Sequence, residues 1–290
     1  MSETEPIPPA TAPHLDEVAA SVERRRAERA ARARVSAVLA PTGVVVGLMI
    51  LWEVGTRAFG VPVFLLPPPS AIVAAIAKHW WLLAVASGVT TLEIVLGFAL
   101  SIAVGIPLAL MIFLWPPFAR AVLPLLVSSQ AMPKVAVAPL LLVWFGFGLV
   151  PKVLIAFLIA FFPVVINTAV GLAAIEPEKI HLARSMGLGA WDTFFKIRLP
   201  DALPAIFAGL KISITLAVVG AVVGEFVGGD AGLGYLLMVA NGSMDTQLLF
   251  AGIVCLTILG VALYLVVELT ERLVIPRHII ASERAAGGTF

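Results

Sequence analysis

The sequence is poor in the residues that build disulfides, metal clusters and soluble surfaces. Its 290 residues include one cysteine and four histidines, and only 13% are charged. A single cysteine, Cys255, excludes a disulfide within the chain and a thiolate metal cluster. The four histidines are far apart and share no metal-binding spacing. We therefore predict no catalytic residues, no metal site and no cofactor in this chain.

Two further absences restrict what the chain binds. No glycine is followed directly by lysine, which excludes a P-loop for nucleotide phosphates. Six arginines lie between Arg24 and Arg34, but no aromatic residue is interleaved with them for stacking on bases. We interpret this run as a positively charged anchor on anionic lipid, and we expect no nucleic-acid partner.

Hydrophobic residues are abundant instead, at 60% of the sequence, with a mean hydropathy of +1.05. Several uncharged runs approach or exceed the roughly 18 to 20 residues that cross a bilayer as a helix. They lack the period-two alternation of barrel strands. The sequence therefore predicts an all-α polytopic membrane helix bundle with about six transmembrane helices, at about 36–56, 88–114, 120–147, 152–174, 204–228 and 247–270.

Positive charge indicates the orientation of this bundle. If the N-terminal tail is cytoplasmic, fourteen of the nineteen Lys and Arg residues lie inside, and Lys152 lies outside. We predict a bacterial inner (plasma) membrane protein with both termini cytoplasmic: a polar tail at 1–35, a permease domain at 36–275 and a second tail at 276–290. Trp80 and Trp81 are expected just before the second span, in an outer aromatic belt.

Polar residues within the spans are the candidate solute contacts. The third span contains three prolines, so we expect it to be kinked or broken. Lys134 there either pairs with a freed backbone carbonyl or attracts an anionic solute. Glu225 closes a helix end, anchors an outer gate or binds solute, and Glu53 pairs with Arg57. Residues that either line a translocation pathway or join helices are Ser128, Ser129, Gln130, Lys134, Asn167, Thr168 and Glu225.

The segment 175–203 is long for a connection between spans, and long loops are usually functional. Its pattern predicts two short amphipathic helices, at about 177–186 and 190–197, that meet at Gly187 and Gly189. Its apolar side chains exceed what a connector needs, so we expect this hairpin to dock on a partner. They are Leu182, Met186, Trp191, Phe194, Phe195 and Ile197.

This segment resembles the Glu-Ala-Ala loop of ATP-binding-cassette (ABC) importer permeases. The family pattern is Glu-Ala-Ala, three residues, Gly, nine residues, then Ile-x-Leu-Pro, and the spacing matches from Ala183 through Gly187 to Pro200. His181 stands at the glutamate position. The stretches 67–70, 139–146 and 224–235 are also similar to permeases of the sulfonate, taurine and nitrate group. The expected ATPase-coupling residues are His181, Ala183, Arg184, Ser185, Met186, Gly187, Gly189, Trp191, Phe194, Phe195, Ile197, Leu199 and Pro200.

The resemblance implies a type I importer that moves a small polar or anionic solute such as a sulfonate, taurine or nitrate. It implies a second permease copy, two ABC ATPase subunits that hold ATP and Mg, and an extracytoplasmic solute-binding protein. One alternative is an ATP-independent secondary transporter or channel, which predicts paired intramembrane charges or inverted repeats; the sequence indicates neither. A membrane-embedded enzyme would need clustered carboxylates or histidines in the spans.

Overall fold

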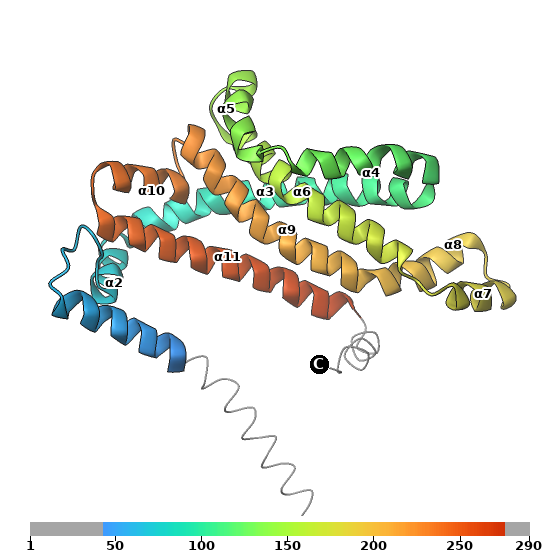
Figure 1. Ribbon diagram of the computed structural model, residues 1–290, viewed down its shortest axis with the longest axis horizontal. Coiled ribbons are helices and arrows are strands. Elements are labelled where there is room, and N and C mark those ends of the chain that lie inside the picture. The colour runs from blue at the N-terminus through green and yellow to red at the C-terminus, as the bar shows by residue number, and fades with distance from the viewer. Residues whose placement is uncertain (1–42, 276–290) are drawn as a thin grey trace, which may run out of the picture. The chain divides into compact units, whose positions relative to one another are not determined.

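The structure is a computed structural model that describes residues 43–275, and no strand occurs within them. Four helices are long and apolar enough to cross a membrane: α3 (Trp80–Leu114), α6 (Leu149–Ala173), the continuous helix that ends with α9 (Leu199–Gly228), and α11 (Thr246–Val274). α4 (Pro116–Gln130) and α5 (Lys134–Phe145) form a fifth crossing if they count as one span. The predicted all-α membrane fold is confirmed (Figure 1).

The chain divides into two compact units. In the smaller unit, the described residues include a helix at 43–58, while the start of the predicted first span at 36 lies outside the described residues. The expected pair Arg57–Glu53 is confirmed, with 2.5 Å between nitrogen and oxygen. The Glu53 carboxylate also accepts hydrogen bonds from the backbone N–H and hydroxyl of Ser70. The predicted tails at 1–35 and 276–290 lie outside the described residues as well.

In the larger unit, α3, α6 and α9 pack through small residues. A Cβ added to Gly220 of α9 would lie 2.5 Å from the Cα of Ala156 on α6, and one added to Gly97 of α3 would lie 2.5 Å from the Cβ of Ala156. Such close approach is how membrane helices gain packing energy when lipid competes for apolar contact. These three helices form the centre of the unit (Figure 1).

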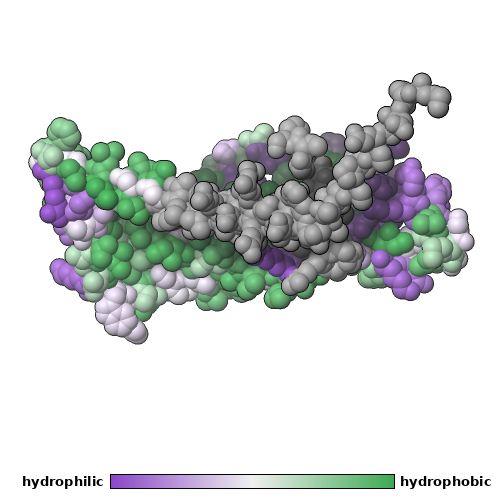
Figure 2. Space-filling model, turned by 90° about the horizontal axis from the view of Figure 1, so that it is seen from below, coloured by the Kyte–Doolittle hydropathy of each residue, from purple (hydrophilic) through white to green (hydrophobic). Residues whose placement is uncertain are grey.

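Hydrophobic side chains also cover much of the exterior. Figure 2 shows a broad hydrophobic area on the visible face, with hydrophilic side chains gathered near the end where Figure 1 places α7 (Pro177–Ser185) and α8 (Ala190–Thr193). Large exposed patches of this kind mark contact with lipid or with other protein chains. The surface agrees with a membrane-embedded bundle whose polar end carries the hairpin.

Several boundaries differ from the sequence predictions. α3 begins at Trp80 and not near 88, because no helix breaker separates the tryptophans from the span, and the tryptophans form its first turn. α6 begins at Leu149 and not at 152, so Lys152 lies in its first turn. The expected break in the third span is confirmed as a 96° bend between α4 and α5. Two short apolar helices flank the spans: α2 (Pro69–Lys78) and α10 (Leu233–Gly242), the latter missed by the sequence analysis.

Candidate functional site

The predicted hairpin is present in the structure. It consists of α7, a turn at 186–189, α8, and a single π-helical turn, η1 (Phe194–Arg198), that continues into α9. Gly187 has φ +81°, which glycine adopts without strain, and the N–H of Leu188 donates to the carbonyl of Ala183 to close α7. The two predicted helices are confirmed, but residues 199–203 belong to α9 and not to the loop. The hairpin is therefore continuous with a helix long enough to cross a membrane.

One surface of the hairpin is apolar and exposed; we call it the hairpin patch. It consists of Leu182, Met186, Trp191 and Phe195, with Trp191 76% exposed. The rings of Trp191 and Phe195 stack with centroids 5.9 Å apart. Phe194 turns the other way and packs against the core. Stacked aromatics exposed to solvent are typical of surfaces that bind another protein.

Two polar contacts tie the hairpin to the spans. Lys179 of α7 donates to Asp201 in the first turn of α9, at 2.9 Å. The hydrogen bond and ion pair with Asp201 raise the pKa of Lys179. The guanidinium of Arg198 lies 5.1 Å from the ring centroid of Phe113 near the C-terminal end of α3, a cation–π distance. The hairpin is thus held against both α9 and α3.

The remaining predicted coupling residues range from buried to exposed. Ala183 is buried, whereas Ile197, Leu199 and Pro200 are half-buried where the hairpin joins α9. The other members are exposed, namely His181, Arg184, Ser185, Gly187 and Gly189. His181, at the family's glutamate position, is therefore exposed and is not among the buried contacts of α7.

The predicted pathway residues are spread along the bundle. Ser128, Ser129 and Gln130 are exposed at the end of α4, and the half-buried Lys134 begins α5 at the bend. On α6, the amide of Asn167 donates to the carbonyl of Pro163, at 2.9 Å. The buried hydroxyl of Thr168, also on α6, has no hydrogen-bond partner among the described atoms. They are not brought together with Glu225, and their role in a pathway stays a prediction.

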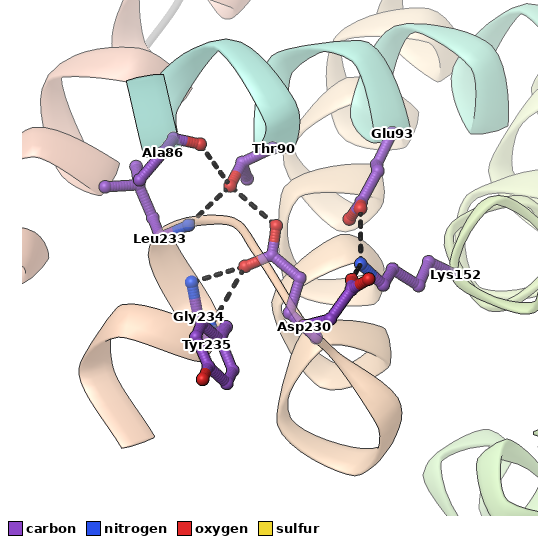
Figure 3. Close-up of polar contacts among 9 residues, drawn as sticks. Ala86, Thr90, Glu93, Lys152, Asp230, Leu233, Gly234 and Tyr235 are labelled. Carbon is purple, nitrogen blue, oxygen red and sulfur yellow. Dashed lines mark hydrogen bonds and ion pairs between the residues drawn. The ribbon is translucent and has the colours of Figure 1, made fainter. Parts of the chain in front are cut away.

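Glu225 lies in a second polar site, in the last turn of α9, and this end of α9 is the one away from the hairpin (Figure 1). Its carboxylate is fully buried and accepts hydrogen bonds from the N–H groups of Gly234 and Tyr235 in the first turn of α10. The hydroxyl of Thr90 on α3 lies 2.6 Å from the other carboxylate oxygen and accepts from the N–H of Leu233 (Figure 3). Glu225 therefore caps α10 and joins it to α3.

A buried lysine lies beside this cap. Lys152 of α6 is 3% exposed, and its Nζ lies 3.1 Å from a carboxylate oxygen of Glu93 on α3 and 3.2 Å from one of Asp230 (Figure 3). Glu93 is 1% exposed, but Asp230, in the turn between α9 and α10, is 81% exposed. The hydrogen bond from Lys152 lowers the pKa of Asp230. We call Glu93, Lys152, Glu225 and Asp230 the acidic cluster.

The sequence analysis missed most of this cluster. The prediction from the sequence included Glu225 but not Glu93, and it gave Lys152 no partner. The statement that the sequence indicates no paired charges in the spans is therefore wrong. A signal was available, because each of these residues interrupts an apolar stretch, and an intramembrane charge is a functional candidate by default. The Lys152–Glu93 pair links α6 to α3 and is buried from solvent. This arrangement indicates that the pair holds the two helices together.

Comparisons with known proteins agree with the architecture. The chain is 40% identical to the riboflavin transport system permease protein RibX of Chloroflexus aurantiacus, over 79% of this chain and 86% of that protein. It is 37% identical to the formylaminopyrimidine transport permease protein ThiX of Halalkalibacterium halodurans, over 82% and 95%. It is 27% identical to the taurine transport system permease protein TauC of Escherichia coli, over 80% and 86%.

The fold is also found among solved structures. An inward-facing structure of the MetNI methionine ABC transporter contains a chain that matches with a TM-score of 0.61 at 20% identity, over 69% of this chain and 99% of that one. The family model described as "Binding-protein-dependent transport system inner membrane component" matches residues 101–279, which include the hairpin and three members of the acidic cluster, Lys152, Glu225 and Asp230. The chain belongs to this family, the permease subunits of type I ABC importers.

Proposed function

We propose that this chain passes a small polar solute inward across a bacterial inner membrane, with both termini in the cytoplasm. ATP and Mg are bound by two separate ATPase subunits, and a second permease copy completes the membrane part. The solute is delivered by an extracytoplasmic binding protein. The family membership supports this division of labour, as does the absence of a P-loop in the sequence.

The hairpin patch carries the proposal. Leu182, Met186, Trp191 and Phe195 are exposed on a segment that continues directly into α9. Clustered exposed apolar side chains commonly mark a surface that a partner covers. A partner that closes on ATP and grips this patch would move α9 and, through the Lys179–Asp201 pair, α7 as one body.

Co-purification with the ATPase tests the proposal. Met186→Glu and Trp191→Ala are expected to abolish recovery of the ATPase on tagged permease, since they remove the centre of the patch. Trp81→Ala is the matched control, because Trp81 is also an exposed tryptophan but lies on α3. Loss of ATPase in the control, or retention in both hairpin variants, would contradict the assignment of the hairpin as the coupling element.

The solute class is a second part of the proposal. The sequence resemblance to sulfonate, taurine and nitrate permeases favours a small anion, but the relatives at 37–40% identity are named for riboflavin and formylaminopyrimidine. We therefore propose a heteroaromatic solute as the first class to test, with sulfonates second. Thermal shift of the co-purified binding protein with riboflavin, pyrimidines and taurine distinguishes them, and stabilisation by taurine alone would reverse this order.

A further inference from the structure

The turn between α9 and α10 is attached to the bundle in two different ways. On one side, Glu225 holds the first turn of α10 through buried hydrogen bonds. On the other, Asp230 reaches Lys152 of α6 through an ion pair in which the aspartate is 81% exposed. One attachment is sealed within protein, and the other is open to water.

The two partners of Lys152 are correspondingly unequal. Glu93 pairs with it inside the bundle, at 3.1 Å, whereas Asp230 pairs with it from the surface, at 3.2 Å. If Asp230 leaves, the buried ammonium keeps Glu93 and is not orphaned. The large free-energy cost of leaving a buried charge without a partner is therefore avoided, and water can solvate the released aspartate. Release of Asp230 is a low-cost event, whereas separation of Lys152 from Glu93 is not.

The backbone on either side of Asp230 permits such a movement. Gly229 precedes it, and Gly232 follows with φ +110°, a conformation that glycine adopts readily. Short glycine-containing turns absorb backbone changes that helices cannot. Asp230 is thus the charged residue of a hinge-like turn, next to a lysine that has a second partner.

We propose that the Asp230–Lys152 ion pair is a latch that holds the turn 229–232 against α6 and is released and re-formed during the transport cycle. This inference rests on the proposed function for its role in the cycle, but the latch itself does not. In the latched state the turn covers the Lys152–Glu93 pair. In the released state the turn moves away while Glu225 keeps α10 in place.

Hydrogen exchange of the purified full-length chain tests the latch directly. Asp230→Asn is expected to speed amide exchange in a peptide spanning the turn by up to about fivefold, the limit for an ion pair with one exposed partner. High salt should produce the same change in the parent protein and none in the variant. Asp245→Asn is the matched control, because Asp245 caps α11 by accepting from the N–H of Leu248. Unchanged exchange in Asp230→Asn, or an equal change in the control, would overturn the latch.

The role in transport is tested on the reconstituted complex. Asp230→Asn is expected to raise the rate of ATP hydrolysis, measured without solute-loaded binding protein, by up to about fivefold. Asp230→Glu should keep the low hydrolysis rate of the parent complex. Faster exchange with an unchanged hydrolysis rate would overturn the role of the latch in coupling. Faster exchange in a chain that recruits no ATPase would leave the latch standing and refute the proposed function instead.

Discussion

The two polar regions of the molecule are built in opposite ways. The hairpin exposes apolar rings and is tied to the bundle by a surface pair, Lys179–Asp201. The acidic cluster buries all its charged groups except Asp230, and its members bridge α3, α6 and the turn after α9. An exposed apolar surface is a site for a separate protein, whereas a buried, paired charge holds helices of one chain together. The difference predicts where a substitution affects assembly and where it affects stability.

The largest expected effect comes from the lysine of the acidic cluster. Lys152→Met leaves the buried Glu93 without its cation and should lower the free energy of unfolding by about 3–5 kcal/mol. Thermal unfolding of the purified protein measures it. Lys211→Met is the control, because the Lys211–Glu271 pair is more exposed, at 23% and 18%, and its loss should cost about 1 kcal/mol or less. Lys152→Met with Glu93→Gln should recover most of the loss, and equal losses in the two lysine variants would contradict the comparison.

Adjacent phenylalanines of the hairpin separate packing from docking. Phe194 packs against the core, so Phe194→Ala should lower the free energy of unfolding by about 2 kcal/mol, part of the cost of a fully buried ring. Phe195 is 56% exposed, so Phe195→Ala should leave stability nearly unchanged but weaken recovery of the ATPase. Thermal unfolding and co-purification of both variants give the comparison, which fails if the two effects are reversed.

Helix packing between the two regions is tested with glycines. Gly220→Ala places a methyl group 2.5 Å from the backbone of Ala156 and should cost about 1 kcal/mol or more after the gain in helix propensity. Gly88→Ala is the control, since nothing lies within 4 Å of its added Cβ, and it should be neutral or stabilising. Equal unfolding temperatures for the two variants would show that α6 and α9 do not pack as described.

The smallest expected effects are on the pH dependence of stability, which differs between an ion pair of the hairpin and one of the acidic cluster. Asp201 raises the pKa of Lys179. The contribution of their ion pair to the free energy of unfolding is therefore complete below about pH 10.5 and is lost as pH rises through the raised pKa. Lys152 lowers the pKa of Asp230. The contribution of this second ion pair to the free energy of unfolding is therefore present above about pH 3.8 and is lost as pH falls through the lowered pKa. Each is worth less than about 1 kcal/mol, because the titrating groups are exposed.

Unfolding temperatures across pH measure both effects. The difference between wild type and Lys179→Met should vanish in alkali, and that between wild type and Asp230→Asn should vanish in acid. A difference that persists at the relevant extreme would show that the variant acts through something other than its ion pair.

Local features were predictable from the sequence because neighbours along the chain create them. The Glu53–Arg57 pair is one helical turn apart, the hairpin turn depends on glycines at 187 and 189, and the bend of the third span follows from its prolines. The first residue of α3 was predicted less well, because an apolar stretch does not mark where a helix leaves the membrane.

Sequence alone determined that this chain is a membrane helix bundle with a helical hairpin before its α9 span, because long apolar runs and the spacing of glycine and proline act locally. Only the tertiary structure decided that Lys152 meets Glu93 and Asp230, and that Glu225 meets Thr90, 135 residues away. Those contacts depend on which faces of α3, α6 and α9 pack together. Each buried charge must find its partner across helices, and no periodicity along the chain specifies that partner.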